Sequence, residues 1–175
     1  MGPEKKMRDT YSVAIFPGSF DPVHYGHLDV VETASELFSK VIWAIGVNPL
    51  KKPMFSLEQR LEMMRLANKF PNVSVASFSG LLVRFAQSQE AGVIVRSLRM
   101  VAADFEYEFQ MTLVNRKLVG ELKTIYIPAG QEHMHMNSTI VRELILSGED
   151  VEGYLPPEVL MFIRGQNIHT RIRLS

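Results

Sequence analysis

Two histidines that frame a glycine stand at the start of a predicted helix, in the run His24-Tyr25-Gly26-His27. The run follows a short apolar segment, 11–16, and a turn that contains Pro17 and Gly18. A strand, a glycine turn and a helix start together direct free backbone N–H groups and a helix dipole toward a phosphate. Gly26 lets a ligand approach the backbone closely between two imidazoles, which titrate near neutral pH. The pattern predicts a phosphate site that carries a histidine; the alternative is a surface turn with a histidine cap.

Basic and polar residues also follow the other predicted strands. Lys51 and Lys52 follow segment 41–47, Arg96 to Arg99 follow segment 93–95, and the loop 133–139 follows segment 124–127. In an open parallel sheet, ligands bind outside the carboxyl ends of the strands. A cluster of cations at that edge suits an anionic ligand with several phosphates. Taken alone, each of these residues fits an ordinary surface charge, so the joint placement carries the prediction.

The elements that must position these residues alternate along the chain. Apolar runs predict strands at 11–16, 41–47, 73–78, 93–95 and 124–127. Helices are predicted at 56–69, 81–89, 104–118 and 138–146, with a last short helix from Pro156-Pro157. Ser56 with Gln59 three residues later is a capping-box pattern. The alternation predicts an α/β fold of Rossmann-like type: an open, mostly parallel sheet with helices on both faces.

The length of 175 residues is most simply one domain. We expect a flexible lead at 1–10, a single domain at 11–164 and a C-terminal tail at 165–175 that is dispensable for chemistry. Hydrophobic content of 46% and charged content of 22% are typical of a soluble globular protein. The start of the chain lacks the apolar core of a signal peptide.

Composition also narrows the classes of function. Nineteen basic and nineteen acidic residues cancel, so neither nucleic acid nor a membrane is expected as a partner. The absence of cysteine excludes disulfides, thiolate metal sites and cysteine nucleophiles, and fits a reducing cytoplasm. Neither a dinucleotide fingerprint nor a P-loop occurs. His133 and His135 could form a metal pair, but the sequence around them favours a nucleotide-contact loop, and no protein metal site is expected.

The string from Phe16 to His27 resembles the nucleotidylyltransferase superfamily, which is marked by a His/Thr-x-Gly-His motif. Later motifs, in order, are similar to the phosphopantetheine adenylyltransferase family: Lys51-Lys52-Pro53-Met54-Phe55, Val95-Arg96-Ser97-Leu98-Arg99, Asp104-Phe105-Glu106-Tyr107-Glu108 and Asn137-Ser138-Thr139-Ile140-Val141-Arg142. The resemblance covers residues 11–160. It implies an α/β nucleotide-binding fold, a cytoplasmic homohexamer, and transfer of the adenylyl group of ATP to 4′-phosphopantetheine. Magnesium would be bound mainly through ATP.

The resemblance also implies roles for single residues. His27 would stabilise the transition state, and Lys51 and Arg96 would orient the acceptor phosphate. Ser19 would help to hold that phosphate and Leu82 would line the pantetheine arm. The expected nucleotide-binding residues are Ser19, Phe20, His27, Ser97, Leu98, Arg99, Glu108, His133, Met134, His135, Met136, Asn137, Ser138 and Thr139.

The chain departs from the family pattern at a few positions. Ser19 stands where the family usually has Thr, and the segment between Arg99 and Asp104 is one residue longer than usual. His133 replaces a position that is often aromatic, and Asn137 replaces a common Ser. Two other functions fit the residues: another small-molecule nucleotidylyltransferase, acting on glycerol phosphate or nicotinamide mononucleotide, and a nucleotide-binding sensor without catalysis.

Overall fold

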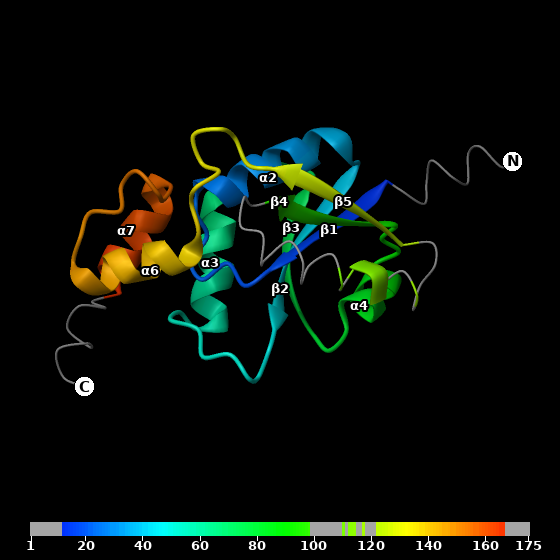
Figure 1. Ribbon diagram of the computed structural model, residues 1–175, viewed down its shortest axis with the longest axis horizontal. Coiled ribbons are helices and arrows are strands. Elements are labelled where there is room, and N and C mark those ends of the chain that lie inside the picture. Colours follow the sequence, from blue (N-terminus) through cyan, green and yellow to red (C-terminus); the bar gives the residue numbers. More distant parts are fainter. Residues whose placement is uncertain (1–11, 99–109, 111, 115–116, 118–121, 167–175) are drawn as a thin grey trace, which may run out of the picture.

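The structure is a computed structural model that describes residues 12–98, 110, 112–114, 117 and 122–166. Its centre is a sheet of five strands in the order β3-β2-β1-β4-β5 (Figure 1). The strands are β1 (Val13–Gly18), β2 (Lys40–Val47), β3 (Val73–Ser79), β4 (Val93–Leu98) and β5 (Lys123–Pro128). All neighbouring strands are parallel. The predicted open parallel sheet is therefore confirmed.

The central strands are apolar because both of their faces are covered. Ile15 of β1 pairs in register with Ile42 on one side and Ile94 on the other, and all three side chains are buried. For this reason, the strands of parallel sheets with helices on both faces have nearly continuous apolar sequences. The short apolar segments of the sequence therefore identified the strands correctly.

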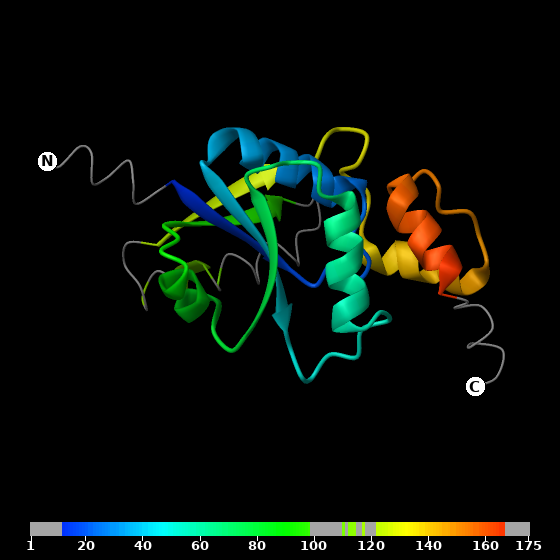
Figure 2. The same cartoon turned by 180° about the vertical axis from the view of Figure 1, so that it is seen from behind.

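Helices cover the two faces of the sheet (Figures 1 and 2). One apolar cluster joins a face of the sheet to α2 (Tyr25–Leu37), α3 (Leu57–Ala67), α6 (Ser138–Ser147) and α7 (Pro157–Gly165). A second cluster joins the opposite face to α4 (Leu82–Ser88). The prediction of helices on both faces is confirmed. Of the predicted helix 104–118, the described residues Gln110, 112–114 and Lys117 are helical, and the rest lies outside the described residues.

Local signals fix the ends of several helices. The Ser56 and Gln59 capping box begins α3 as predicted, with Ser56 Oγ accepting from Gln59 N at 3.2 Å. Asn137 caps α6, and Gly148 ends it with a φ of 76° in the left-handed region that favours glycine. Helix α7 reaches Gly165, and Gln59 Nε2 donates to Gln166 Oε1 at 2.9 Å. The last helix therefore extends slightly into the segment that the sequence assigned to the tail.

Strand β4 is longer than predicted. The sequence indicated a strand at 93–95, but it continues to Leu98 because Arg96, Ser97 and Leu98 pair with residues 126–128 of β5. The positions expected in a loop after β4 are therefore held in the sheet itself. The polar character of Arg96 and Ser97 concealed this, since a strand end at the ligand edge of a sheet need not be apolar.

The strand order creates one reversal in the direction of chain progress. From β1 the chain moves outward to β2 and β3 on one side, and it then returns to β4 and β5 on the other. Ligands of open α/β sheets bind in the crevice outside the carboxyl ends at such a point, which here lies between β1 and β4. Within the described residues, no helix combines the length and apolar character needed to cross a bilayer.

Candidate functional site

The turn after β1 is built on a buried aromatic ring. Phe20 has a φ of 46° and a side chain that is only 2% exposed. Its ring centroid lies 5.3 Å from that of Phe16 and 5.4 Å from that of Trp43, both edge-on. The ring of His27 packs edge-on against the other side of Phe20 at 4.9 Å. Because the Phe20 ring is in the core, a contact from Phe20 to a nucleotide would have to come from its backbone.

His27 lies at the third position of α2 and is 5% exposed. Its Nδ1 accepts a hydrogen bond from the backbone N–H of His24 at 3.2 Å. A backbone N–H can only donate, so Nδ1 carries no proton and the neutral ring holds its proton on Nε2. The His24 ring stacks on His27 with a centroid separation of 3.6 Å. The sequence motif thus produces a neutral imidazole donor with a fixed tautomer at a helix N-terminus.

Gly26, between the two histidines, is required by its neighbours. A Cβ atom built there would lie 3.2 Å from the carbonyl oxygen of His133 and 3.2 Å from the His24 ring. Such contacts are tighter than ordinary van der Waals packing. The glycine therefore lets the loop after β5 approach the start of α2, which brings two of the predicted ligand-binding segments together.

Asp21 ties the first turn to the loop that follows β2. Its side chain is buried, and its carboxylate accepts from Met54 N through Oδ2 and from Phe55 N through Oδ1, both at 2.9 Å. Arg142 of α6 donates from Nη1 to the Asp21 carbonyl oxygen at 2.6 Å and lies 3.6 Å from Oδ2. Three segments that are distant in sequence therefore meet at one carboxylate.

Arg60 of α3 also holds the turn that follows β1. Its Nη1 donates to the carbonyl oxygen of Ser19 at 2.9 Å, and the residue is 6% exposed. Burial lowers the pKa of the Arg60 guanidinium, while the nearby Asp21 carboxylate acts in the opposite direction. The carbonyl group of Ser19 is thus fixed. The hydroxyl-bearing side chain of Ser19 remains exposed at the end of β1.

Lys51 and Arg96 lie at the carboxyl edge of the sheet, like Ser19. Lys51 is exposed in the loop after β2, and Arg96 is half-buried near the end of β4, in register with Tyr126. Ser97 follows it in the strand and is half-buried. Leu82 is half-buried at the start of α4, where it packs against the second apolar cluster. Parallel strands present their carboxyl ends at one edge, so the sheet brings the strand-end residues to the same side of the molecule.

The loop after β5 is held against α2. His133 Nδ1 lies 2.8 Å from Asp29 Oδ2, which also accepts from Gly130 N at 2.7 Å. The His133 ring stacks on Tyr25 at a centroid distance of 5.3 Å. With an ionised Asp29 as acceptor, His133 Nδ1 is the protonated nitrogen. A side chain expected to contact the nucleotide therefore also anchors its own loop.

The other predicted residues of the loop after β5 differ in burial, and several of them form hydrogen bonds within the protein. Met136 is buried, Met134 is half-buried, and the exposed His135 meets the Tyr154 ring edge-on at 6.4 Å. Asn137 Oδ1 accepts from Ile140 N at 2.9 Å. Ser138 Oγ donates to the Pro22 carbonyl oxygen at 2.9 Å, and Thr139 Oγ1 accepts from Arg142 at 3.0 Å. The side chain of Leu98, and the residues Arg99 and Glu108, lie outside the described part of the chain.

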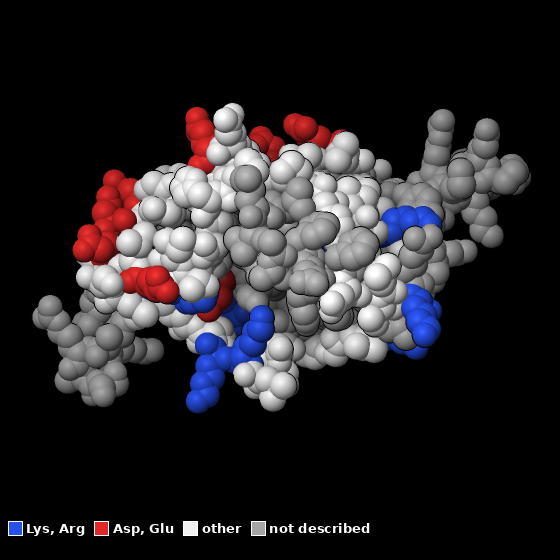
Figure 3. Space-filling model, viewed as in Figure 1, with Lys and Arg blue, Asp and Glu red and all other residues white. Residues whose placement is uncertain are grey.

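The cationic, hydroxyl and N–H donors of the predicted site suit phosphate oxygens. Among the residues that the structure describes, no group of three or more His, Cys, Asp or Glu side chains could hold a metal. Figure 3 shows Lys and Arg side chains at the lower edge of that view, below α3, and also at its right-hand side. Asp and Glu side chains lie instead over the end formed by α6 and α7 and along the top.

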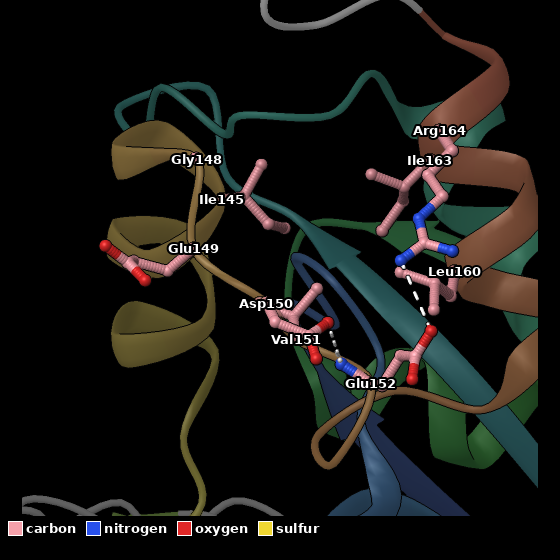
Figure 4. A pocket seen from close by; sticks show the side chains of 9 residues that line it. All are labelled: Ile145, Gly148, Glu149, Asp150, Val151, Glu152, Leu160, Ile163 and Arg164. Carbon is pink, nitrogen blue, oxygen red and sulfur yellow. Dashed lines mark hydrogen bonds and ion pairs between the residues drawn. The ribbon is translucent and has the colours of Figure 1, made fainter.

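A pocket of about 360 Å³ lies at that acidic end (Figure 4). It is lined by Ile145, Gly148, Glu149, Asp150, Val151, Glu152, Leu160, Ile163 and Arg164, from α6, the following turn and α7. Arg164 Nη2 already donates to Glu152 Oε1 at 3.4 Å. The other carboxylates would repel a phosphate, and the lining includes none of the predicted site residues. This pocket is therefore a poor candidate for binding a nucleotide.

Sequence reasoning missed the residues that hold the site in place: Asp21, Asp29, Arg60 and Arg142. Asp21 and Arg142 stand inside two of the quoted motifs, but no role was predicted for either of them. The partners of these residues lie 33 to 121 positions away in the sequence. Spacing along the chain carries no information about contacts over such separations.

Comparisons with known proteins agree with this geometry. Residues 15–144 match the cytidylyltransferase-like family model. The chain is 48% identical over 150 residues to a phosphopantetheine adenylyltransferase of Heliobacterium modesticaldum, covering 85% of this chain and 89% of that protein. It is 51% identical over 145 residues to the phosphopantetheine adenylyltransferase of Symbiobacterium thermophilum, covering 82% and 89%.

A solved structure shares the fold at low sequence identity. It is a protein of Vibrio parahaemolyticus described as a candidate nicotinate-nucleotide adenylyltransferase. The TM-score is 0.67 at 18% identity, over 91% of this chain and 95% of the other. The family match covers most of the chain, and the identity to the two bacterial relatives extends over more than four-fifths of it. The chain therefore belongs to the cytidylyltransferase-like family and, within it, to the phosphopantetheine adenylyltransferases.

Proposed function

We propose that this protein transfers the adenylyl group of ATP to 4′-phosphopantetheine, giving dephospho-coenzyme A and pyrophosphate. The observation that carries the proposal is His27. Its Nδ1 is occupied by the backbone N–H of His24 at 3.2 Å, so its proton is on Nε2, at the N-terminus of α2. A neutral donor there suits an α-phosphate oxygen on which charge develops. Membership of the phosphopantetheine adenylyltransferases supports the choice of acceptor.

The reaction needs no strong general base. An oxygen of the acceptor phosphate, already ionised, attacks the α-phosphorus of ATP. A new P–O bond forms, the bond from the α-phosphorus to the bridging oxygen breaks, and pyrophosphate leaves with that electron pair. The protein must place two anions in line and stabilise the charge that moves onto the non-bridging and leaving oxygens.

The acceptor phosphate would be held by cations at the edge of the sheet. Lys51 would supply a mobile ammonium group, and Arg96 a planar guanidinium that can bind two phosphate oxygens. Ser19, exposed at the end of β1, would add a hydroxyl donor. Leu82 would line the path of the pantetheine arm. The reversal of strand order between β1 and β4 supports this location for the two substrates.

ATP would enter as its magnesium complex and lie against the loop after β5. The His133 to Thr139 segment approaches the start of α2 through the His133–Asp29 contact of 2.8 Å. The backbone of that loop would contact adenine and ribose, and Ser138 would face the phosphates together with Arg99. Magnesium, a hard cation that keeps several waters and binds substrate phosphates, would be held mainly by the triphosphate and water.

Pyrophosphate release in the presence of ATP, magnesium and 4′-phosphopantetheine tests the proposal. We expect release only when the acceptor is present. Equal or faster turnover with glycerol phosphate or nicotinamide mononucleotide would assign the protein to another reaction. Binding of ATP without acceptor-dependent release or exchange of pyrophosphate would identify a nucleotide sensor.

We further propose a homohexamer in the cytoplasm, where ATP is abundant. The helical residues near β5 support self-association. Leu113 and Val114 are 53% and 49% exposed, and the hydroxyls of Thr112 and Tyr126 lie 2.9 Å apart, which seats this segment on the sheet edge. Large exposed apolar side chains at a sheet edge favour contact with another copy. Light scattering at micromolar concentration tests this, and a monomer mass would contradict it.

A further inference from the structure

We propose that Asp21 is a positioning residue for Lys51: its carboxylate fixes the loop that carries Lys51 relative to the turn that leads to His27. The proposal rests on the proposed function, since it assigns a role in holding the acceptor phosphate. The proposal can be tested separately from the function, because it is argued from contacts within the protein.

The carboxylate uses both of its oxygens on one loop. Oδ2 accepts from Met54 N and Oδ1 from Phe55 N, each at 2.9 Å, across 33 and 34 positions of sequence. Asp21 is 4% exposed, so water cannot substitute for these two donors. Hydrogen bonds to an ionised acceptor are about twice as strong as those between neutral groups. The pair of bonds therefore acts as a stiff connection between the end of β1 and the end of the β2–α3 loop.

The other end of the loop is fixed by its own turn. Asn48 Oδ1 accepts from Leu50 N at 2.9 Å, and the Asn48 carbonyl accepts from Lys51 N at 3.1 Å. Only Lys52 and Pro53 separate Lys51 from the Met54 amide that Asp21 holds. Proline fixes its own φ near −65° and restricts the residue before it. Little conformational freedom is left between Lys51 and the carboxylate.

Backbone placement matters here because the Lys51 side chain is exposed. An exposed lysine samples many rotamers, so its average position depends on where its Cα lies. Arg142 completes the arrangement, with Nη1 2.6 Å from the Asp21 carbonyl oxygen and 3.6 Å from Oδ2. The same guanidinium offsets the negative charge of Asp21, which would otherwise repel a phosphate. Asp21 therefore orients a cation while its own charge is compensated.

The Asp21→Asn variant tests the proposal with nearly unchanged shape. Its amide group replaces one acceptor by a donor that faces a backbone N–H, so the loop loses at least one of the two bonds. We expect kcat/KM for 4′-phosphopantetheine to fall about tenfold and KM for ATP to change less than twofold. Phe55 is 1% exposed and continues to anchor the loop through the core, so we expect the variant to fold.

A double-mutant cycle with Lys51→Ala separates positioning from a general loss of structure. If Asp21 acts through Lys51, adding Asp21→Asn to Lys51→Ala changes kcat/KM for the acceptor by less than twofold. The comparison variant is Asp29→Asn. In the wild type, the Asp29 carboxylate holds the loop after β5, so we expect this variant to change KM for ATP. Effects of Asp21→Asn and Lys51→Ala that multiply independently, or a folded Asp21→Asn with full acceptor kcat/KM, would overturn the proposal.

Two further readouts do not depend on the folding of the Asp21 variant, and the first of them does not depend on turnover. In the wild-type protein without substrates, the Met54 and Phe55 amides should exchange with solvent deuterium at least tenfold more slowly than the Lys52 amide. Asn48→Ala, at the exposed end of the loop, should lower acceptor kcat/KM severalfold and leave KM for ATP unchanged. Fast exchange at Met54 and Phe55 would show that Asp21 does not hold these two amides, and it would overturn the proposal. Absence of turnover in the wild type with slow exchange at both amides would refute the proposed function and leave the connection intact.

Discussion

The imidazole of His27 owes the position of its proton to a backbone amide. His24 N–H occupies Nδ1 at 3.2 Å, so no carboxylate is needed to set the tautomer. The arrangement favours a neutral donor whose strength does not depend on prior protonation. Phe20, edge-on at 4.9 Å, restricts the ring from the other side.

His27→Ala should lower kcat by at least 10²–10³-fold, or about 2.7–4 kcal/mol, because it removes a preorganised donor to a developing oxyanion. KM for ATP should change far less, since several other groups would contact the phosphates. Steady-state assays of pyrophosphate release give both constants. The matched control is Glu152→Gln in the acidic pocket, which should leave both constants unchanged. A variant with near-normal kcat and weakened ATP affinity would assign His27 to binding, and the catalytic role would pass to Lys51 or Arg96.

Single residues were predictable where they stand next to a strand end. The location of Ser19, Lys51 and Arg96 at one edge of the sheet was predictable because the carboxyl ends of parallel strands share that edge, and their roles in the reaction stay a prediction. Their supports were not predictable. Arg60 meets the Ser19 carbonyl across 41 positions, and His133 meets Asp29 across 104. Such pairs depend on how helices pack on the sheet, which a local sequence pattern does not encode.

At the scale of elements, the turn from β1 to α2 depends on a glycine that makes room for Phe20. A Cβ atom on Gly18 would lie 2.6 Å from Phe20 Cζ, and that ring is enclosed by Phe16, Trp43 and His27. Gly18→Ala should therefore destabilise the fold by about 1–3 kcal/mol, as overpacking does, and should also lower kcat by displacing His27.

Urea unfolding and turnover measure the two effects of Gly18→Ala. Gly153→Ala serves as its control, because a Cβ atom there meets nothing within 4 Å. The control should have the kcat of the wild type and a urea midpoint equal to that of the wild type within experimental error. Equal midpoints for the two variants would show that Phe20 can move aside without cost.

Two helix starts carry glutamates, the exposed Glu58 and the half-buried Glu158, that make stability depend on pH. The pKa of Glu58 in α3 is lowered chiefly by its own backbone N–H and then by the Ser56 hydroxyl. The pKa of Glu158 in α7 is lowered chiefly by its own backbone N–H and then by Lys69. A carboxylate with a lowered folded-state pKa stabilises the protein above its unfolded pKa, about 4.3, and loses this contribution as pH falls through the folded value.

The double variant Glu58→Gln/Glu158→Gln should accordingly have a lower urea midpoint than the wild type at pH 6, and the difference should vanish near pH 3. Urea titrations at intervals of about half a pH unit check the sign and the window. A difference that stays constant down to pH 3 would show that the two charges do not contribute. Salt should reduce the contribution of Glu58 more than that of Glu158, since Glu58 is exposed and Glu158 is half-buried.

Elements were predicted where apolar periodicity and capping agree. The Ser56 and Gln59 box placed the start of α3, and Gly148 placed the end of α6. The length of β4 was wrong because its last residues are held by pairing with β5 and carry polar side chains. Edge pairing is a property of the assembled sheet, so a single segment cannot reveal it.

At the scale of the whole molecule, the zero net charge conceals a separation of charges. On the face that Figure 3 shows, acidic side chains lie over the α6–α7 end and along the top, and basic side chains lie below α3 and at the right-hand side. Glu149, Asp150 and Glu152 line the pocket at the acidic end. Anionic substrates would therefore be repelled from that pocket and attracted to the basic side chains below α3. Net charge alone could not predict this, because it is a sum over a surface whose layout depends on the fold.

A chain that ends at Gln166 should keep wild-type kcat and KM. The predicted tail lies beyond the residues that hold the site, whereas Gln166 accepts a hydrogen bond from Gln59 of α3 at 2.9 Å and should be retained. Turnover of the shortened protein and its melting temperature check this. Loss of turnover in a shortened protein that still melts cooperatively would give residues 167–175 a direct part in the reaction.

Trp43 is the chain's one tryptophan; it is fully buried and packs edge-on against Phe20 at 5.4 Å. Phe20 in turn touches the ring of His27. The protein therefore contains a native fluorophore one side chain away from its proposed catalytic group. Emission intensity and wavelength should report on rearrangements of the first turn as substrates bind, in stopped-flow time and without an attached label. Such a signal would follow the arrival of ATP and of the acceptor separately, before any pyrophosphate is released.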